Sequence, residues 1–273
     1  AKGYYMNTYT PPEVWDYQSI KAKNGGTFGG TNRPTAGATH EQKLPVGDSP
    51  YQLYSLNTPN GIKVNILLQE LKQLGAITGY DAYKINIMAG DQFGSDFVKI
   101  NPNSKIPALL DQSTTPATRI FESGAILLYL AQKHNAFIPT NLNQLSELYS
   151  WLMWQMGSAP FVGGGFGHFY AYAPEPMEYP INRYAMETKR QLDVLDQHLA
   201  NHTFMIKDDY TIADMAIYPW YGRLCLGELY VSDSYDAAKF LEVHTYQNVI
   251  RWAKAIAARE AVQYAQSLEL KVI

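Results

Sequence analysis

The strongest constraint on the fold is a change in the spacing of apolar residues along the chain. Residues 51–56 (Tyr-Gln-Leu-Tyr-Ser-Leu) have the character of a β-strand, whereas residues 62–74 carry apolar side chains at helical spacing. Residues 80–87 alternate again as a strand does. A strand, a helix and a second strand in this order predict a right-handed parallel crossover.

The segments that follow complete a second unit. Two short apolar stretches, 106–111 and 118–121, predict a hairpin, and residues 122–134 predict a strongly apolar helix. The order β-α-β and then β-β-α is that of a thioredoxin-like domain. Four stretches of helical spacing and no further strand come afterwards, at 142–156, 180–202, 212–226 and 246–258. We therefore predict a thioredoxin-like α/β domain over 51–138 and an all-α domain over 139–273.

The first 50 residues form a separate region in which glycine and proline interrupt any helical pattern. Such a segment can be a disordered tail. It also contains aromatic residues, in which disordered segments are usually poor. These are Tyr4, Tyr5, Tyr9, Trp15, Tyr17 and Phe28. We therefore predict an irregular but ordered arm, residues 1–50, that lies over the body of the protein.

Composition limits the class of protein. The 273 residues are 46% hydrophobic and carry a net charge of −3, which allows two buried cores and gives no electrostatic sign of a nucleic-acid or membrane partner. No apolar run has the length of a membrane span, and the start of the chain does not resemble a signal peptide. The one cysteine, Cys225, cannot form an internal disulfide. These features favour a cytoplasmic protein, and no metal site is expected.

A turn with the sequence Asn57-Thr58-Pro59-Asn60-Gly61 joins the first strand to the first helix. Pro59 fixes φ, and Gly61 permits a close approach of the backbone. Thr58 and Asn60 lie at the helix N-terminus, where free N–H groups and the helix dipole favour an anion. Both residue types are also favoured helix caps, so this turn alone is compatible with capping or with anion binding.

Two further motifs place polar groups beside apolar elements. Ile106-Pro107 opens a strand, and a cis bond there would expose the Ile106 backbone to a ligand. The preceding Lys105 can pair with a carboxylate or remain a solvated surface residue. Glu122-Ser123 opens the helix at 122–134, where Ser123 can serve as a cap. The same pair can instead hold an amino-acid head group, with its carboxylate at the helix end and its ammonium on Glu122.

Three other features have a mainly structural interpretation. Thr211 and Asp214 have the spacing of a capping box, so Asp214 is expected to start a helix and not to act in catalysis. Cys225, between two leucines, is interpreted as a small buried apolar residue. His168 and Tyr170 lie in a glycine-rich loop and can line a substrate pocket or serve packing.

Taken in order, these motifs resemble those of glutathione transferases, most closely the bacterial nu class. The resemblance covers residues 32 to 261. Two segments of the arm, 32–34 (Asn-Arg-Pro) and 39–41 (Thr-His-Glu), resemble the N-terminal extension of that family. The other matching segments are 53–61, 90–93 (Gly-Asp-Gln-Phe), 101–109, 121–124, 163–170 and 181–183.

The resemblance implies the glutathione transferase fold, a homodimer, and one or two bound glutathione molecules per subunit. The residues that would hold the γ-glutamyl end and the peptide backbone are Lys105, Ile106 through its main chain, Glu122 and Ser123. Thr58 and Asn60 would lie at the sulfur, with Pro59 beside them in the cofactor site.

Four more residues complete the site that the resemblance implies. Gln92 would reach the glycyl end of glutathione, and Arg183 would enter from the other subunit. Asn32, on the arm, would close the pocket over a second glutathione. Tyr179 would line the same channel.

The source of the reactive sulfur follows from the position of the cysteine. No cysteine lies in the predicted α/β domain, which excludes a mixed disulfide with the enzyme near the helix end. Tyr54 and Ser55 point to opposite faces of a strand, so at most one of them can reach the pocket. We therefore expect the thiolate to belong to glutathione, stabilised by Thr58, Asn60 and the N–H groups of the helix end.

These expectations favour a glutathione-dependent reductase of small disulfides, with some transferase or peroxidase activity. Two alternatives stay open: a transferase that conjugates a small electrophile, and a non-catalytic interaction protein with the same fold. The joint presence of the residues expected to bind glutathione disfavours the second alternative.

Overall fold

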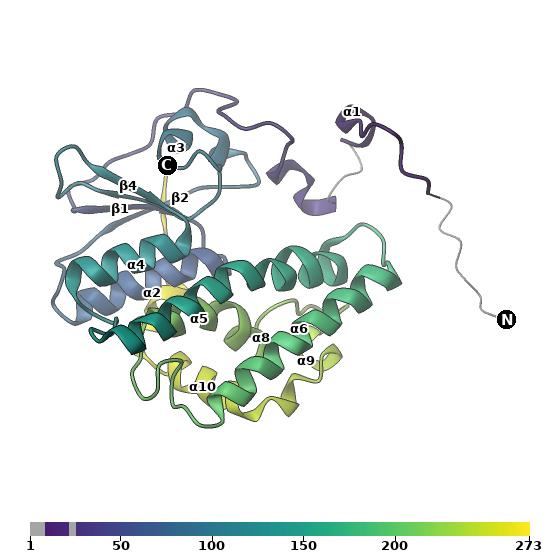
Figure 1. The fold of residues 1–273 in the computed structure, drawn as a ribbon. Helices are drawn as coiled ribbons and strands as arrows, with labels where there is room; N and C mark the ends of the chain where they lie inside the picture. Colours follow the sequence, from purple (N-terminus) through teal and green to yellow (C-terminus); the bar gives the residue numbers. More distant parts are fainter. Residues whose placement is uncertain (1–8, 22–25) are drawn as a thin grey trace.

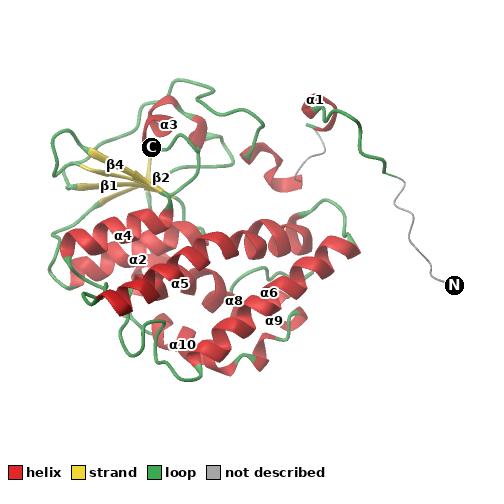
Figure 2. Cartoon of the chain, in the orientation of Figure 1, coloured by secondary structure: helices red, strands yellow, loops and turns green. Residues whose placement is uncertain are grey.

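The computed structural model describes residues 9–21 and 26–273, so residues 1–8 and 22–25 of the predicted arm lie outside the described residues. The described chain forms a small sheet layer above a larger layer of helices (Figures 1 and 2). The strands are β1 (Tyr51–Ser55), β2 (Asp81–Lys84), β3 (Ala108–Asp111), β4 (Thr118–Phe121) and β5 (Lys271–Val272). The helices are α1 (Tyr17–Ile20), α2 (Pro59–Gln73), α3 (Ser95–Ile100), α4 (Ser123–His134), α5 (Leu142–Pro160), α6 (Glu178–Leu199), α7 (Ile212–Ile217), α8 (Arg223–Cys225), α9 (Ala237–Phe240), α10 (Gln247–Ala257) and α11 (Glu260–Ser267). Short 3₁₀ segments are η1 (Gly26–Thr31), η2 (Asp91–Phe93) and η5 (Val243–Thr245), and wider π-type segments are η3 (Phe161–Tyr172) and η4 (Tyr218–Gly222).

The sheet confirms the predicted thioredoxin-like order. Its strands are arranged β4-β3-β1-β2-β5, with β1 and β2 parallel and β3 antiparallel to both β1 and β4. The expectation that no strand follows the helix at 122–134 is wrong, because β5 pairs in parallel with β2. Two residues are too few to show a strand alternation, which is why the apolar spacing does not reveal β5.

Helices cover both faces of the sheet. α2 and α4 pack below it, and α3 lies above it (Figure 1). The upper core is small and includes Tyr54, Tyr83 and Phe97. The lower core continues from Leu53 on β1 through α2 and α4 into the helical layer. The division at residue 138 stays a prediction, because this core crosses it without a break.

Two helical segments differ from their predicted form. The stretch 212–226 is divided into α7, η4 and α8, and Pro219 within η4 cannot donate the hydrogen bond of a regular α-helix. The glycine-rich stretch predicted as a loop is the helical segment η3. Its glycines accommodate aromatic rings, because a Cβ on Gly163 would lie 2.6 Å from the Trp220 ring and one on Gly167 would lie 2.1 Å from that of Tyr230.

The arm packs on the body over only part of its length. Phe28 meets the Tyr172 ring edge-on at 4.9 Å, the Thr39 N–H donates to the carbonyl of Phe93, and the Tyr54 hydroxyl donates to that of Pro45. In contrast, residues 9–16 and α1 extend away from the body (Figure 1). The prediction that the arm lies over the body therefore holds for residues 26–50 and is wrong for residues 9–21.

Candidate active site

Three adjoining cavities lie where the turn at 57–61, the start of α4 and the helical layer meet. Their volumes are about 740, 180 and 210 Å³. Asn60 lines all three, and six other predicted residues line two of them each: Thr58, Pro59, Lys105, Ile106, Glu122 and Ser123. The fold thus brings together residues from the two ends of the thioredoxin-like domain.

The turn before α2 is compatible with both helix capping and ligand binding. The Thr58 hydroxyl accepts a hydrogen bond from the Gly61 N–H at 3.3 Å, so it caps the helix while it also lines the cavity. Gly61 is required by space, because a Cβ there would lie 1.9 Å from the carbonyl oxygen of Leu56. Capping and cavity lining are therefore properties of the same residue.

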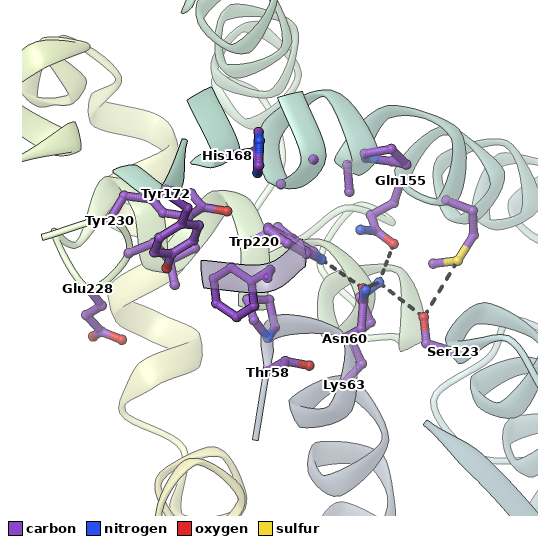
Figure 3. Close-up of a pocket in the computed structure, with 18 of the residues that line it drawn as sticks. Thr58, Asn60, Lys63, Ser123, Gln155, His168, Tyr172, Trp220, Glu228 and Tyr230 are labelled. Atoms are coloured by element: carbon purple, nitrogen blue, oxygen red, sulfur yellow. Dashed lines mark hydrogen bonds between the residues drawn. The ribbon is translucent and has the colours of Figure 1, made fainter. Parts of the chain in front are cut away.

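The side chain of Asn60 is held in one orientation. Its Oδ1 accepts hydrogen bonds from Lys63 Nζ and Trp220 Nε1, each at 2.9 Å (Figure 3). Both partners are donors only, so the carboxamide oxygen must face them. The Asn60 NH₂ group then faces the other way, and no hydrogen bond within the described residues uses it.

Lys63 lies at the centre of the site, and the sequence analysis did not identify it. It is 1% exposed, and its Nζ also donates to Gln155 Oε1 at 2.8 Å and to Ser123 Oγ at 3.2 Å (Figure 3). Burial lowers the pKa of the Lys63 ammonium to about 7, and the charge of Glu122 opposes part of this change. The available signal was a lysine within an otherwise apolar stretch of the helix, three residues after Asn60.

The start of α4 favours the binding interpretation over simple capping. Ser123 is the first helical residue and does not act as the cap, and the Glu122 side chain at the cap position makes no capping hydrogen bond. Glu122 has a φ of 73°, which is unusual for a residue other than glycine. Such backbone conformations occur often at binding sites.

The smaller cavities are formed by the segment before β3. Lys105 and Ile106 line both of them, and the Ile106–Pro107 bond is cis. Gln92 lines one, and its Nε2 donates to the Ile87 carbonyl at 3.1 Å. Asn32 approaches the site from the arm and accepts a hydrogen bond from Lys105 Nζ.

The large cavity has an aromatic wall that the sequence analysis did not predict. Its aromatic residues include Phe28, Tyr172, Trp220, Tyr230 and Tyr235, and Phe28 belongs to the arm. His168, one of the two candidates from the glycine-rich segment, also lines this cavity. The other candidate, Tyr170, packs against Phe166 and Phe240 instead.

Three predicted residues line none of these cavities: Asn32, which contacts the site through Lys105, and the pair Arg183 and Tyr179. Arg183 and Tyr179 are both on α6, where they are exposed, and Tyr179 is 75% accessible to solvent. Neither lines any of the three cavities of its own chain. The geometry of a single chain therefore gives neither residue a place in the cavity lining.

The protein's own candidate nucleophiles are also outside the site. Tyr54 is buried, its ring stacks on that of Tyr83, and burial raises the pKa of its hydroxyl. Ser55 is buried and contacts the Leu56 carbonyl. Cys225 is buried in the helical layer, and this burial raises the pKa of its thiol to about 12. None of these groups can act on a ligand in the cavities.

Within residues 9–21 and 26–273, no group of three or more His, Cys, Asp or Glu side chains is placed to hold a metal ion. None of the helices in this part of the chain is long and apolar enough to cross a membrane.

The chain is similar to known proteins both in sequence and in fold. Residues 49–132 match the N-terminal domain of glutathione S-transferases. The chain is 56% identical to the disulfide-bond oxidoreductase YghU of Escherichia coli over 94% of this chain and 87% of that protein. The glutathione transferase YghU from Streptococcus pneumoniae, complexed with glutathione, superposes with a TM-score of 0.92 at 57% identity, over 97% of this chain and 99% of that one. A glutathione transferase family member from Pseudomonas fluorescens, with two glutathione bound, gives a TM-score of 0.72 at 35% identity, over 81% and 94%.

Proposed function

Because the chain belongs to the glutathione S-transferase family, we propose that it binds glutathione in the three adjoining cavities and uses the sulfur of glutathione to reduce small disulfides. The observation that carries this proposal is the position of Asn60 and Thr58. They lie at the N-terminus of α2 and face the cavities, whereas the chain's one cysteine is buried elsewhere. A thiol held there must therefore come from a ligand.

The site offers a complementary group for each part of the tripeptide. The γ-glutamyl end carries an ammonium and a carboxylate, which fit the Glu122 side chain and the start of α4 beside Ser123. The Ile106 main chain then pairs with the peptide backbone. Gln92 and Lys105 complete the groove, and Asn32 on Lys105 closes it from the arm.

The sulfur lies between the two polar residues of the turn. The Asn60 NH₂ group, the Thr58 hydroxyl and the positive end of the α2 dipole stabilise a thiolate, because helix N-termini lower thiol pKa values. This thiolate attacks one sulfur of a disulfide, the S–S bond breaks, and the leaving thiolate takes up a proton. A second glutathione then attacks the mixed disulfide. Two glutathiones are oxidised to one glutathione disulfide, and the substrate becomes two thiols.

The large cavity accommodates the second reactant. Its volume of about 740 Å³ lies in the range of small-molecule sites and suits a disulfide or a second glutathione. The aromatic wall also favours an alternative activity, the conjugation of glutathione to an aromatic electrophile. Turnover of hydroxyethyl disulfide compared with that of a chlorinated aromatic compound distinguishes the two activities.

We also propose that the chain acts as a homodimer in the cytoplasm. The support is that Arg183 and Tyr179 are exposed on α6. Other exposed apolar side chains of this helical layer include Met153 on α5, Phe161 at the start of η3, Met177 directly before α6 and Met186 on α6. Sedimentation analysis tests the dimer, and fractionation of cells that express the protein tests the location.

The binding proposal is tested by calorimetry with reduced and oxidised glutathione. Heat of binding with at least one of them is expected. Folded protein that gives no heat with either would overturn the proposal, and it would favour the non-catalytic interaction protein.

Replacing Asn60→Ala tests the thiolate assignment. It removes a donor aimed at the sulfur, so we expect the pKa of the bound thiol to rise by about 1 and kcat/KM for disulfide reduction to fall about 100-fold. The matched control is Asn201→Ala, at an exposed position in the helical layer. An unchanged pH–rate profile in the Asn60 variant would show that Asn60 does not act on the sulfur.

A further inference from the structure

We propose that Lys63 is a positioning residue that serves two of the anionic groups of bound glutathione, the thiolate beside Asn60 and the γ-glutamyl α-carboxylate beside Ser123. This inference rests on the proposed function. It assigns a role to Lys63, which is almost fully buried and also lines the large cavity.

The geometry places one cation between two of the proposed binding residues, Asn60 and Ser123. Lys63 Nζ donates to Asn60 Oδ1 at 2.9 Å and to Ser123 Oγ at 3.2 Å, and Gln155 Oε1 accepts the third hydrogen bond at 2.8 Å (Figure 3). These three partners lie on α2, α4 and α5 and are all neutral. The ammonium therefore links the sulfur end of the site to its carboxylate end.

Lys63 lacks the ion pair that a buried cation normally requires. Its side chain is almost fully buried, and none of the ion pairs formed by the described residues includes it. A buried charge without a counter-ion is unfavourable. An anion that enters the cavities next to Asn60 or Ser123 compensates this charge, so the site is organised for an anionic ligand.

The same ammonium fixes the direction of the Asn60 amide. Lys63 and Trp220 both donate to Oδ1, so rotation of the amide would bring its NH₂ group against two donors. With Oδ1 held, the NH₂ group is directed away from Lys63 and toward the proposed sulfur. Lys63 thus acts on the sulfur through Asn60.

The groups that face Lys63 determine its charge. They are Asn60 on α2, Glu122 and Ser123 at the start of α4, and Gln155 on α5. Burial lowers the pKa of the ammonium to about 7 in the free protein, and Glu122 favours the charged form. The charged form is lost as the pH rises through 7, whereas a bound thiolate favours it. Because this coupling is reciprocal, the ammonium lowers the pKa of the thiol.

The test compares Lys63→Met with Lys72→Met, which replaces an exposed lysine on the same helix. The ultraviolet absorbance of the thiolate is followed against pH in the glutathione complex. In Lys63→Met we expect the pKa of the bound thiol to rise by about 1 and kcat/KM for disulfide reduction to fall roughly 10- to 100-fold. Lys72→Met should match the parent protein in both measurements.

Two more variants keep the test decisive. Trp220→Phe removes the other donor to Asn60 without changing the charge, and it should raise the thiol pKa less than Lys63→Met does. If Lys63→Met does not fold by circular dichroism, Lys63→Gln replaces it, because its amide can still donate a hydrogen bond but carries no charge.

The outcomes separate the two proposals. If the parent protein does not bind glutathione, the proposed function fails. If the parent protein binds and ionises glutathione, and a folded Lys63 variant has the same thiol pKa and rate as Lys72→Met, the role of Lys63 fails while the proposed function stands.

Discussion

At the scale of single residues, Asp214 shows how a capping motif can also organise a core. Its Oδ2 accepts a hydrogen bond from the Thr211 N–H at 2.9 Å, as its spacing from Thr211 predicts. Its Oδ1 accepts from the Met205 N–H at 2.9 Å and from Trp252 Nε1 at 2.8 Å. All of these groups are buried, so the carboxylate satisfies donors from three segments of the helical layer.

Replacing Asp214→Ala should therefore strongly destabilise the fold. The change leaves three buried donors without an acceptor, and we expect the free energy of unfolding to fall by about 3–5 kcal/mol. Denaturant unfolding measures the change. Asp233→Ala, at an exposed position, should alter the stability by less than about 0.5 kcal/mol. Equal unfolding midpoints for the two variants would contradict this account.

The site residues at the ends of strands and helices could be predicted from the sequence, whereas Lys63, which is buried inside a helix, could not. Thr58, Asn60 and Glu122 lie where a strand gives way to a helix, so a change in apolar spacing marks them. Lys63 lies inside a helix, where a lysine normally indicates the solvent-facing side. Its partners Ser123 and Gln155 are 60 and 92 residues away, a separation that periodicity along the chain does not connect.

At the scale of elements, segments that span at least two periods of their own repeat were predicted, and shorter or glycine-rich ones were not. β1, α2, β2, the β3–β4 hairpin and α4 correspond to predicted segments. α3 and β5 have only 6 and 2 residues, too few to establish a period. η3 was predicted as a loop because glycine is a poor helix former. Its helical form depends on rings contributed by Tyr184, Trp220 and Tyr230.

This explanation of η3 can be tested with two alanine variants. In Gly167→Ala the new methyl group collides with the Tyr230 ring, so we expect a loss of about 1–3 kcal/mol in stability. Gly157→Ala, on the neighbouring α5, meets no atom within 4 Å and should be neutral or stabilising by up to about 1 kcal/mol. Thermal unfolding compares the two. A Gly167 variant as stable as the Gly157 variant would show that the ring contact does not limit η3.

At the scale of the whole molecule, the three cavities of one chain do not include every residue predicted for the site. Arg183 is exposed on α6 and lies outside all three cavities. Family resemblance predicted that it acts across a dimer interface, and sequence periodicity cannot test an arrangement between subunits. An experiment that mixes subunits can.

We expect Arg183→Ala and Asn60→Ala each to be poorly active alone and to complement each other when unfolded and refolded together. A mixed dimer contains one complete site, with Asn60 from one subunit and Arg183 from the other. Equal amounts should therefore recover about a quarter of the parent activity, because half of the dimers are mixed and each has one intact site. Activity equal to the average of the two variants would exclude a role for Arg183 across the interface.

The pairing of β5 with β2 also sets an order of events during synthesis. Residues 51–121 supply four strands early, but the free side of β2 is not covered until residues 271 and 272 have been made. An uncovered strand edge is a template for association with other chains. The nascent protein must therefore keep this edge from pairing wrongly until residues 271 and 272 have left the ribosome.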